Sequence, residues 1–155
     1  FIRLINEKKY ISNSIMNNIK KQDLQYGFSN EARVKPQLDN VFGELINNNI
    51  INKYSKIDFQ NDMFGVEYKR RRINFGQYET LFFEEGKIDE GWNYVNNGKR
   101  VFFIWECNNG LYYWELKEGE YFYEIGGRTD RGFDERKRLA NIKLEHIKPL
   151  SELIF

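Results

Sequence analysis

The chain has very little cysteine or histidine. Its 155 residues include one cysteine, Cys107, and one histidine, His146. A single cysteine excludes an internal disulfide and a cysteine-based zinc site. A single histidine disfavours histidine-rich metal sites, and we find no Ser-His-Asp partner set. Candidate chemistry therefore has to come from carboxylates and lysines.

Long apolar runs and a large net charge are also missing. No segment approaches the length needed to cross a bilayer, and the chain starts without a signal-peptide pattern. We therefore expect no membrane partner and an intracellular protein, cytoplasmic, nuclear or associated with virions. The formal net charge of +1 means that nucleic-acid binding must depend on local patches. The chain begins at Phe1 rather than Met, which indicates a processed product or a piece of a longer protein.

Aromatic residues are abundant, at 17% of the chain. This content and the length predict a single domain over residues 1–155, of the α/β (mixed α+β) class. Periodicity and turn residues predict helices over 6–22, 30–47 and 87–97. They predict strands on both arms of a hairpin within 54–70, and over 101–107, 111–116, 121–125 and 140–147.

The start of the second helix has two alternatives. Asn30 is a candidate N-cap with Glu31 in the first turn, but Pro36 favours a start near residue 36. The buried stripe of this helix is expected to be Leu38, Val41, Phe42, Leu45 and Ile46, at the spacing of one helix face.

A hairpin around Asn61-Asp62 is the most informative segment of the chain. Polar and apolar residues alternate on both arms, which is the period-2 pattern of paired strands. A two-residue loop at Asn61-Asp62 sets the register of the arms. The opposed pairs are then Phe59 with Phe64, Ile57 with Val66, and Asp58 with Gly65. The four apolar members of these pairs are expected to share one buried layer.

Acidic side chains lie on the other face of this hairpin. Asp58 and Glu67 are diagonal neighbours, roughly 7–8 Å apart, which is close enough for two carboxylates to share one metal ion. Gly65 is expected to leave the space between them open, and Lys69 lies one strand repeat beyond Glu67. Two acids and a lysine beside room for an ion indicate metal-assisted phosphodiester hydrolysis.

A second hairpin offers a rival pair of acids. Glu106 and Glu115 share a face if Asn109-Gly110 are the central residues of its turn. This hairpin has Glu where metal sites of this kind usually have Asp, and no basic run follows it. The first hairpin is therefore preferred.

Asp58, followed across a hairpin by Glu67-Tyr68-Lys69, resembles the motif of the PD-(D/E)XK nuclease superfamily. The flanking residues are similar to those of its small members in large DNA viruses and phages, and the similarity covers roughly residues 54–125. Ile57 stands where the family often has Pro. The resemblance implies a restriction-endonuclease-like core, a central mixed sheet flanked by helices. The core strands would be those of the first hairpin together with 101–107 and 111–116.

The resemblance also implies roles for residues of the motif. Asp58 and Glu67, aided by the backbone carbonyl of Tyr68, would hold Mg²⁺ or Mn²⁺. Lys69 would hold the attacking water and help to neutralise the transition state.

Two further catalytic residues are expected from the family pattern. Glu31 matches the Glu that the family often places on the helix before the hairpin. As a bare helix-start residue it would simply complement the helix dipole. Gln77 lies just past the motif, where related nucleases often have a polar site residue.

Four basic residues are expected to contact the DNA backbone. Arg71 shares the strand face of Glu67, and Lys87 lies in a matching Gly-Lys-Ile-Asp segment from which it could reach a phosphate. Arg128 and Arg131 begin a second basic patch, in a glycine-containing loop that suits closing over DNA. Solvated surface charge is the alternative interpretation of all four.

These observations predict a metal-dependent deoxyribonuclease, an endo- or exonuclease that hydrolyses DNA phosphodiester bonds. A homodimer or larger assembly would complete its DNA cleft. The main alternative is a non-catalytic nucleic-acid-binding or virion structural domain that retains the nuclease fold. A protein-interaction module with an aromatic sheet face is a third class, which leaves the acids unexplained.

Overall fold

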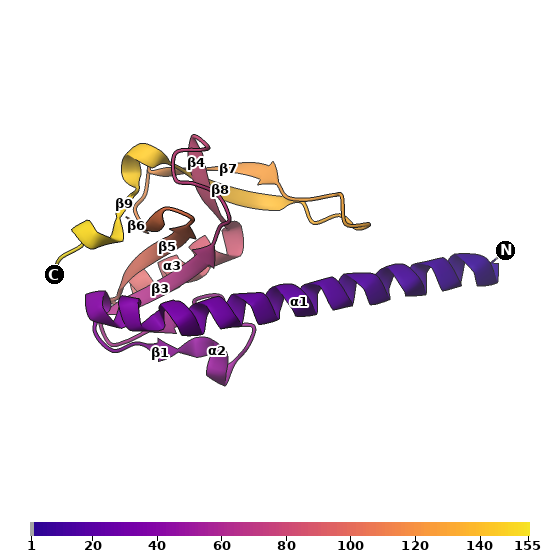
Figure 1. Ribbon diagram of the computed structural model, residues 1–155, viewed down its shortest axis with the longest axis horizontal. Coiled ribbons are helices and arrows are strands. Elements are labelled where there is room, and N and C mark those ends of the chain that lie inside the picture. The colour runs from indigo at the N-terminus through magenta and orange to yellow at the C-terminus, as the bar shows by residue number, and fades with distance from the viewer. Residues whose placement is uncertain (1) are drawn as a thin grey trace.

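The computed structural model describes residues 2–155, with side chains from Ser14 onward. It is a mixed α+β structure with a mixed sheet and flanking helices, as expected, and it also contains a second, smaller sheet (Figure 1). The helices are α1 (Ile2–Phe42), α2 (Asn48–Ile51) and α3 (Glu85–Asn96). The strands are β1 (Ile46–Asn47), β2 (Phe59–Gln60), β3 (Phe64–Arg70), β4 (Thr80–Glu84), β5 (Arg100–Cys107), β6 (Gly110–Glu115), β7 (Tyr121–Gly126), β8 (Lys137–Lys143) and β9 (Lys148–Pro149). Two 3-10 helices, η1 (Leu144–His146) and η2 (Leu150–Glu152), flank β9.

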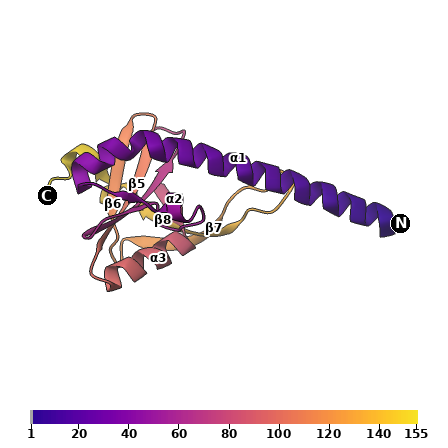
Figure 2. The ribbon, with the colours of Figure 1, turned by 90° about the horizontal axis from the view of Figure 1, so that it is seen from below.

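Helix α1 runs through the segment where the sequence predicts two separate helices. Its 41 residues span about 60 Å, and the first part projects beyond the body of the molecule (Figures 1 and 2). Pro36 lies inside it. Asn30 does not cap a helix; its side-chain amide donates to the Tyr26 carbonyl at 3.1 Å within α1. The predicted starts at residue 30 and near residue 36 are both wrong, and Glu31 lies in the middle of the helix.

Burial explains why Pro36 does not end the helix. A proline in a helix interior costs about 3 kcal/mol. Val34 and Leu38 on either side of it are completely buried, and Phe42 is almost so. Each such apolar side chain contributes about 1.5–3 kcal/mol on burial, so packing outweighs the local cost. Ile46, expected on the same stripe, lies in β1 and is 57% exposed.

The larger sheet contains all four strands that the sequence assigns to the central core. Its order is β1-β2-β3-β5-β6-β9, in which β3 and β5 are parallel and the other pairs antiparallel. Helix α1 covers one face of this sheet. Helix α3 and the smaller antiparallel sheet β4-β8-β7 cover the other face. The larger sheet therefore lies between one layer formed by α1 and another formed by α3 and the smaller sheet.

The register of the first hairpin differs by two residues from the expected one. The observed partners are Phe59 with Val66 and Gln60 with Gly65. The turn is centred on Asp62-Met63, and the Asn61 amide donates to the Phe64 carbonyl at 3.0 Å. Because side chains alternate with a period of two, an offset of two residues leaves each on its expected face. Phe59, Phe64 and Val66 therefore pack in the core cluster that contains α1, and Glu67 points toward α3. Ile57 is fully buried but is not a member of that cluster.

Two other boundaries also differ from expectation. The second hairpin pairs Cys107 with Gly110, so its turn is Asn108-Asn109 and not Asn109-Gly110. Strand β8 starts three residues before the expected strand and ends at Lys143, where η1 begins. Among the residues that the structure describes, no helix has both the length and the apolarity to cross a membrane.

Candidate functional site

Three buried carboxylates come together where α1, β3 and the segment before β2 meet. Glu31 lies on α1, Asp58 directly before β2, and Glu67 on β3. Their exposed fractions are 6%, 5% and 1%. Asp58 is close enough to the other two for its negative charge to raise the pKa of both. The structure thus brings the three sequence-predicted acids into one cluster.

Asp58 is held in place by two N–H donors. Its Oδ2 accepts from the backbone N–H of Tyr68 at 3.0 Å, and its Oδ1 accepts from the side-chain amide of Asn49 at 2.8 Å. The same amide group donates to Oε2 of Glu31 at 3.0 Å. Asn49 therefore bridges the two acids. Our sequence interpretation missed this residue, and the only signal was the run Asn47-Asn48-Asn49 ahead of the hairpin.

Glu67 has one strong partner and one oxygen without any. Its Oε2 lies 2.7 Å from Nζ of Lys87, which comes from the first turn of α3. Its Oε1 is buried and has no hydrogen-bond partner among the described residues. An unsatisfied buried polar atom costs about 1–3 kcal/mol, and more when it is charged. A proton shared with Asp58, a further donor or a cation would therefore stabilise this oxygen.

Burial is the main cause of the altered acidity in the cluster. It raises the pKa of Glu67 well above the ordinary range; Asp58 adds to this, while the Lys87 ammonium opposes it. Burial and then the charge of Asp58 raise the pKa of Glu31 to about 8, against the opposing effect of Asn49. At neutral pH the cluster therefore retains protons that a bound cation would displace.

The donor set has the chemistry of a site for a hard divalent ion. Carboxylate and backbone carbonyl oxygens are the ligands that Mg²⁺ prefers. Asp58 and Glu67 supply carboxylates, and the Tyr68 carbonyl lies on the same strand edge as the N–H that binds Asp58. Of the side chains that the structure describes, no three His, Cys, Asp or Glu are already arranged as a metal-binding group. The arrangement is thus a carboxylate pair with an unsatisfied oxygen and not a preformed cage.

The two lysines near the cluster differ in environment. Lys69 lies two residues beyond Glu67 on β3, so it shares the strand face of that acid, and it is exposed. It forms no ion pair within the described part of the chain. Lys87, expected to contact DNA, is instead engaged with Glu67, and its side chain is 28% exposed. The structure thus places Lys87 in contact with Glu67, and Lys69 in solvent on the same strand face as Glu67.

The expected open space at Gly65 is filled. A Cβ added to this glycine would lie 2.5 Å from Cδ2 of Tyr94 on α3. Gly65 is therefore needed for the close approach of α3 to β3, and the idea that it leaves room for an ion is wrong. The Tyr94 hydroxyl accepts a hydrogen bond from Asn48 at 3.1 Å, which ties α3 to the segment carrying Asn49.

Gln77 and Arg71 lie outside the cluster. Gln77 is exposed, and its side-chain oxygen accepts from the Asn74 amide at 3.2 Å within its own loop. The Arg71 guanidinium is half-buried, 4.3 Å from the centre of the Phe82 ring, and burial lowers its pKa. No contact connects either residue to the acids in the described part of the chain.

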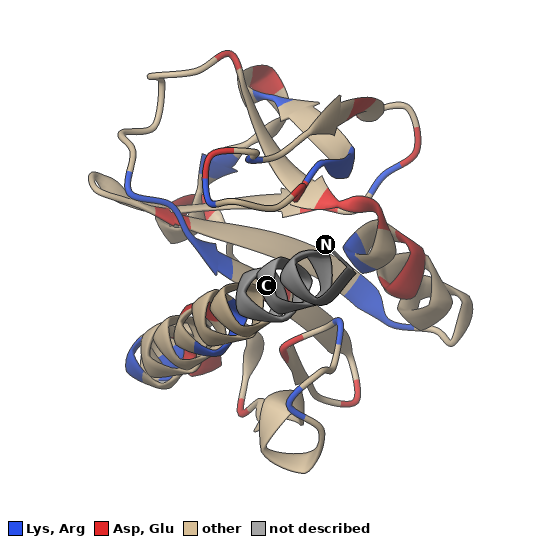
Figure 3. Cartoon of the chain, turned by 90° about the vertical axis from the view of Figure 1, so that its right-hand side faces the viewer, with Lys and Arg blue, Asp and Glu red and all other residues tan. Residues whose placement is uncertain are grey.

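The expected second basic patch is neutralised by its own acids. Arg128 pairs with Asp130 at 2.9 Å. Arg131 binds Glu135 and also reaches Asp23 of α1 at 3.1 Å. On the side of the molecule seen in Figure 3, Lys and Arg are interleaved with Asp and Glu and are not gathered in one cationic area. This loop is a network of surface ion pairs.

The rival acids of the second hairpin are also paired. Glu106 accepts hydrogen bonds from Arg33 and from the Tyr68 hydroxyl, and Arg33 contributes to lowering its pKa. Glu115 is bound by Arg100 at 2.7 Å. Both carboxylates thus have arginine partners, whereas Glu67 has an unsatisfied oxygen.

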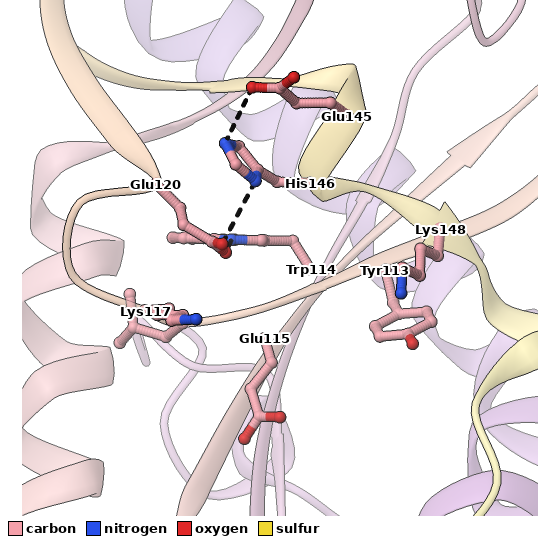
Figure 4. Close-up of a pocket in the computed structure, with 9 residues that line it drawn as sticks. Tyr113, Trp114, Glu115, Lys117, Glu120, Glu145, His146 and Lys148 are labelled. Carbon is pink, nitrogen blue, oxygen red and sulfur yellow. Dashed lines mark hydrogen bonds and ion pairs between the residues drawn. The ribbon is translucent and has the colours of Figure 1, made fainter.

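A separate cavity of about 560 Å³ lies at the end of β6 (Figure 4). His146 lies in it between two acids, with Nδ1 3.2 Å from Glu120 and Nε2 3.4 Å from Glu145. Glu120 also accepts from the Trp114 indole at 3.0 Å. These groups satisfy one another, and the acid cluster around Glu67 does not line this cavity.

Comparison with known proteins finds no matching family model, no matching curated protein and no matching solved structure. The functional interpretation therefore depends on the acid cluster and its surroundings.

Proposed function

We propose that the protein is a metal-dependent nuclease of the PD-(D/E)XK type that hydrolyses DNA. The observation that carries the proposal is the unsatisfied Oε1 of Glu67 beside Asp58. Burial and then the charge of Asp58 raise the pKa of Glu67, and a buried acid perturbed in this way is a candidate for a functional site. A simple surface ion pair would leave neither acid buried.

The architecture supports the same proposal. A mixed sheet flanked by helices is what the resemblance implies, and the four expected core strands form β2, β3, β5 and β6 of one sheet. Glu31 reaches the cluster from the helix before the hairpin, the position that the family pattern implies. The restriction-endonuclease-like core is part of this proposal.

Each residue of the cluster would have a separate role in binding the metal ion or the attacking water. Asp58 and Glu67, with the Tyr68 carbonyl, would hold Mg²⁺ or Mn²⁺, which when bound acidifies a water and stabilises charge on the phosphate. Asn49 orients Asp58 and Glu31. Lys69, which is exposed on the strand face of Glu67, would orient the attacking water and neutralise charge that develops on the phosphate.

The proposal is tested by cleavage of DNA in Mg²⁺ or Mn²⁺, with chelator as the metal-free control. Glu67→Gln should lower the rate by about 10²–10³-fold, because it removes a charged ligand while keeping the shape of the side chain. Glu115→Gln is the matched control and should retain most activity. Loss of cleavage in Glu115→Gln, with cleavage intact in Glu67→Gln, would place the site at the other hairpin.

A non-catalytic DNA-binding domain is the second candidate, and the Lys87 ion pair favours it. An internal ammonium 2.7 Å from Glu67 supplies the positive charge that an ion would otherwise supply. This candidate predicts salt-sensitive DNA binding that needs no metal, and no cleavage by the parent protein in either ion.

A further inference from the structure

The segment of residues 48–56, which consists of α2 and the turn that follows it and is called here the apolar loop, carries large apolar side chains in solvent beside the acid cluster. Ile50 and Ile51 are 84% and 81% exposed, and Tyr54 is 71% exposed. Scattered exposed apolar residues are ordinary, but three within five positions form a local patch. This patch takes no part in the packing of either core cluster.

The base of the apolar loop is firmly held. Asn48 is buried, and its backbone N–H donates to the Asp58 carbonyl at 2.8 Å. Its side-chain amide donates to the Ile57 carbonyl at 2.9 Å, and its Oδ1 accepts from Gln60 at 2.7 Å. The next residue, Asn49, binds the two acids. The exposed tip is thus attached to a fixed base that is itself part of the site.

The charge of the loop favours an anionic partner. Residues 48–56 contain two lysines and no acidic residue. Nζ of Lys53 lies 5.2 Å from the centre of the Tyr54 ring, and Lys56 is next to Gly86 at the start of α3, one residue before Lys87. Lysine beside exposed aromatic and aliphatic side chains is the composition of surfaces that hold a phosphate backbone and stack on bases.

The size of the patch argues against a protein partner. Stable protein interfaces bury about 800 Å² on each side, from some 20–30 residues. Three side chains on one short loop are far fewer than that. They are enough to stack on one or two unpaired bases or to enter a base step, as apolar side chains of DNA-bending proteins do.

We propose that the apolar loop is a wedge that engages unpaired or unstacked bases next to the scissile phosphate. Tyr54 stacks on a base, Ile50 and Ile51 keep it out of the duplex, and Lys53 and Lys56 contact the backbone. The preferred substrate class is then DNA with single-stranded or frayed segments, and not fully paired duplex. This inference rests on the proposed nuclease function, because the acid cluster supplies the reason for holding a base at that place.

The test measures the affinity of the full chain for oligonucleotides in Ca²⁺, which supports binding without requiring cleavage. The probes are a single strand, a duplex with a frayed end and a blunt duplex, each with 2-aminopurine near the expected contact. We expect the first two to bind at least about tenfold more tightly than blunt duplex. Tyr54→Ala should remove about tenfold of this affinity, the loss typical of one base stack.

Matched variants separate the loop from general effects. Ile50→Asn with Ile51→Asn should abolish the 2-aminopurine fluorescence change on the frayed duplex. Ile125→Asn should leave it intact, because Ile125 is 69% exposed on β7, a strand that lies on the opposite side of the body from α2 in Figure 1. Equal affinity for all three probes, or loop variants that bind like the parent, would overturn the proposal. Unchanged DNA binding with a loss of self-association in the loop variants would assign the loop to protein contacts instead.

A separate assay tests the nuclease function without involving the apolar loop. Hydrolysis of bis(p-nitrophenyl) phosphate by the parent protein in Mn²⁺ reports on the acid cluster without any base contact. If this hydrolysis is absent, the proposed function is wrong, while the affinities measured in Ca²⁺ still decide the role of the loop. If it is present and the three DNA probes bind equally, the function stands and the wedge is wrong.

Discussion

The ammonium of Lys87 lies 2.7 Å from Oε2 of Glu67 and joins α3 to β3 within the acid cluster. Glu67 is almost completely buried, so the pair is shielded from screening by salt. The other oxygen of Glu67 has no partner in the described residues. One oxygen of this buried carboxylate is therefore paired with an internal cation, and the other is the oxygen at which the proposed metal ion would bind.

Removing this ammonium should destabilise the protein in a pH-dependent way. Lys87→Met keeps most of the aliphatic stem but leaves an ionised Glu67 buried without a partner, which typically costs about 3–5 kcal/mol. Burial raises the pKa of Glu67, so protonation removes the buried charge more readily as the pH falls, and the loss should be smaller at pH 5 than at pH 8. Urea unfolding at the two pH values measures this difference. Lys117→Met, at an exposed position, is the control; equal losses at both pH values for Lys87→Met would contradict the account.

The metal-free protein should lose stability as the pH rises from about 5 to 8. Folding raises the pKa of Glu31 from 4.5 to about 8, so the folded state binds the proton more tightly than the unfolded state. Stability from this proton is fully present below the unfolded pKa and is lost as the pH rises through the folded pKa. The decrease should be up to about 3 kcal/mol for this group.

Glu31→Gln should flatten this pH dependence, because the amide does not titrate yet can still accept from Asn49. Glu44→Gln, at an exposed position on the chain after α1, should leave the slope unchanged. A parent protein whose stability rises between pH 5 and pH 8 in chelator would show that the carboxyls of the cluster are ionised without a metal.

Lys69 should act on the reaction more than on binding. Lys69→Ala removes a positive charge from the strand face of Glu67 and leaves Asp58 and Glu67 in place. An interaction made mainly in the transition state lowers kcat more than it weakens binding, and one such contact is worth about 10²–10³-fold. DNA affinity in Ca²⁺ should fall only slightly. A variant that cuts as fast as the parent protein would make Lys69 an ordinary surface lysine.

The hairpin could be predicted from sequence because its information is local. Alternation places Phe59 and Glu67 on opposite faces in both the expected and the observed register, because the two registers differ by two residues. The predicted position of the turn is wrong because Oδ1 of Asn61 accepts hydrogen bonds from the backbone amides of Met63 and Phe64, at 3.0 and 2.9 Å. This fixes a turn centred one residue further along than Asn61-Asp62.

Features that depend on tertiary contacts could not be predicted in this way. The continuity of α1 through Pro36 depends on burial of Val34 and Leu38 against the sheet, which no local signal contains. The position of Lys87 depends on how α3 packs over Gly65. Lys87, which the sequence predicts to contact DNA, therefore forms an ion pair with Glu67. The contact of Arg131 with Asp23 of α1 likewise depends on the tertiary fold, whereas the pairs of Arg128 with Asp130 and of Arg131 with Glu135 are local in sequence.

Anomalous scattering from crystals of the protein soaked in Mn²⁺ at pH 8 shows directly whether Asp58 and Glu67 hold a metal ion. We expect an anomalous peak for a manganese ion bound by Asp58 and Glu67, about 2.0–2.5 Å from their carboxylate oxygens. Lys87 should then be displaced from Glu67. Glu67→Gln crystals treated in the same way should lack the peak. A Lys87–Glu67 ion pair that stays intact with no manganese at these two acids, or manganese bound instead by Glu120 and Glu145 in the other cavity, would contradict this expectation.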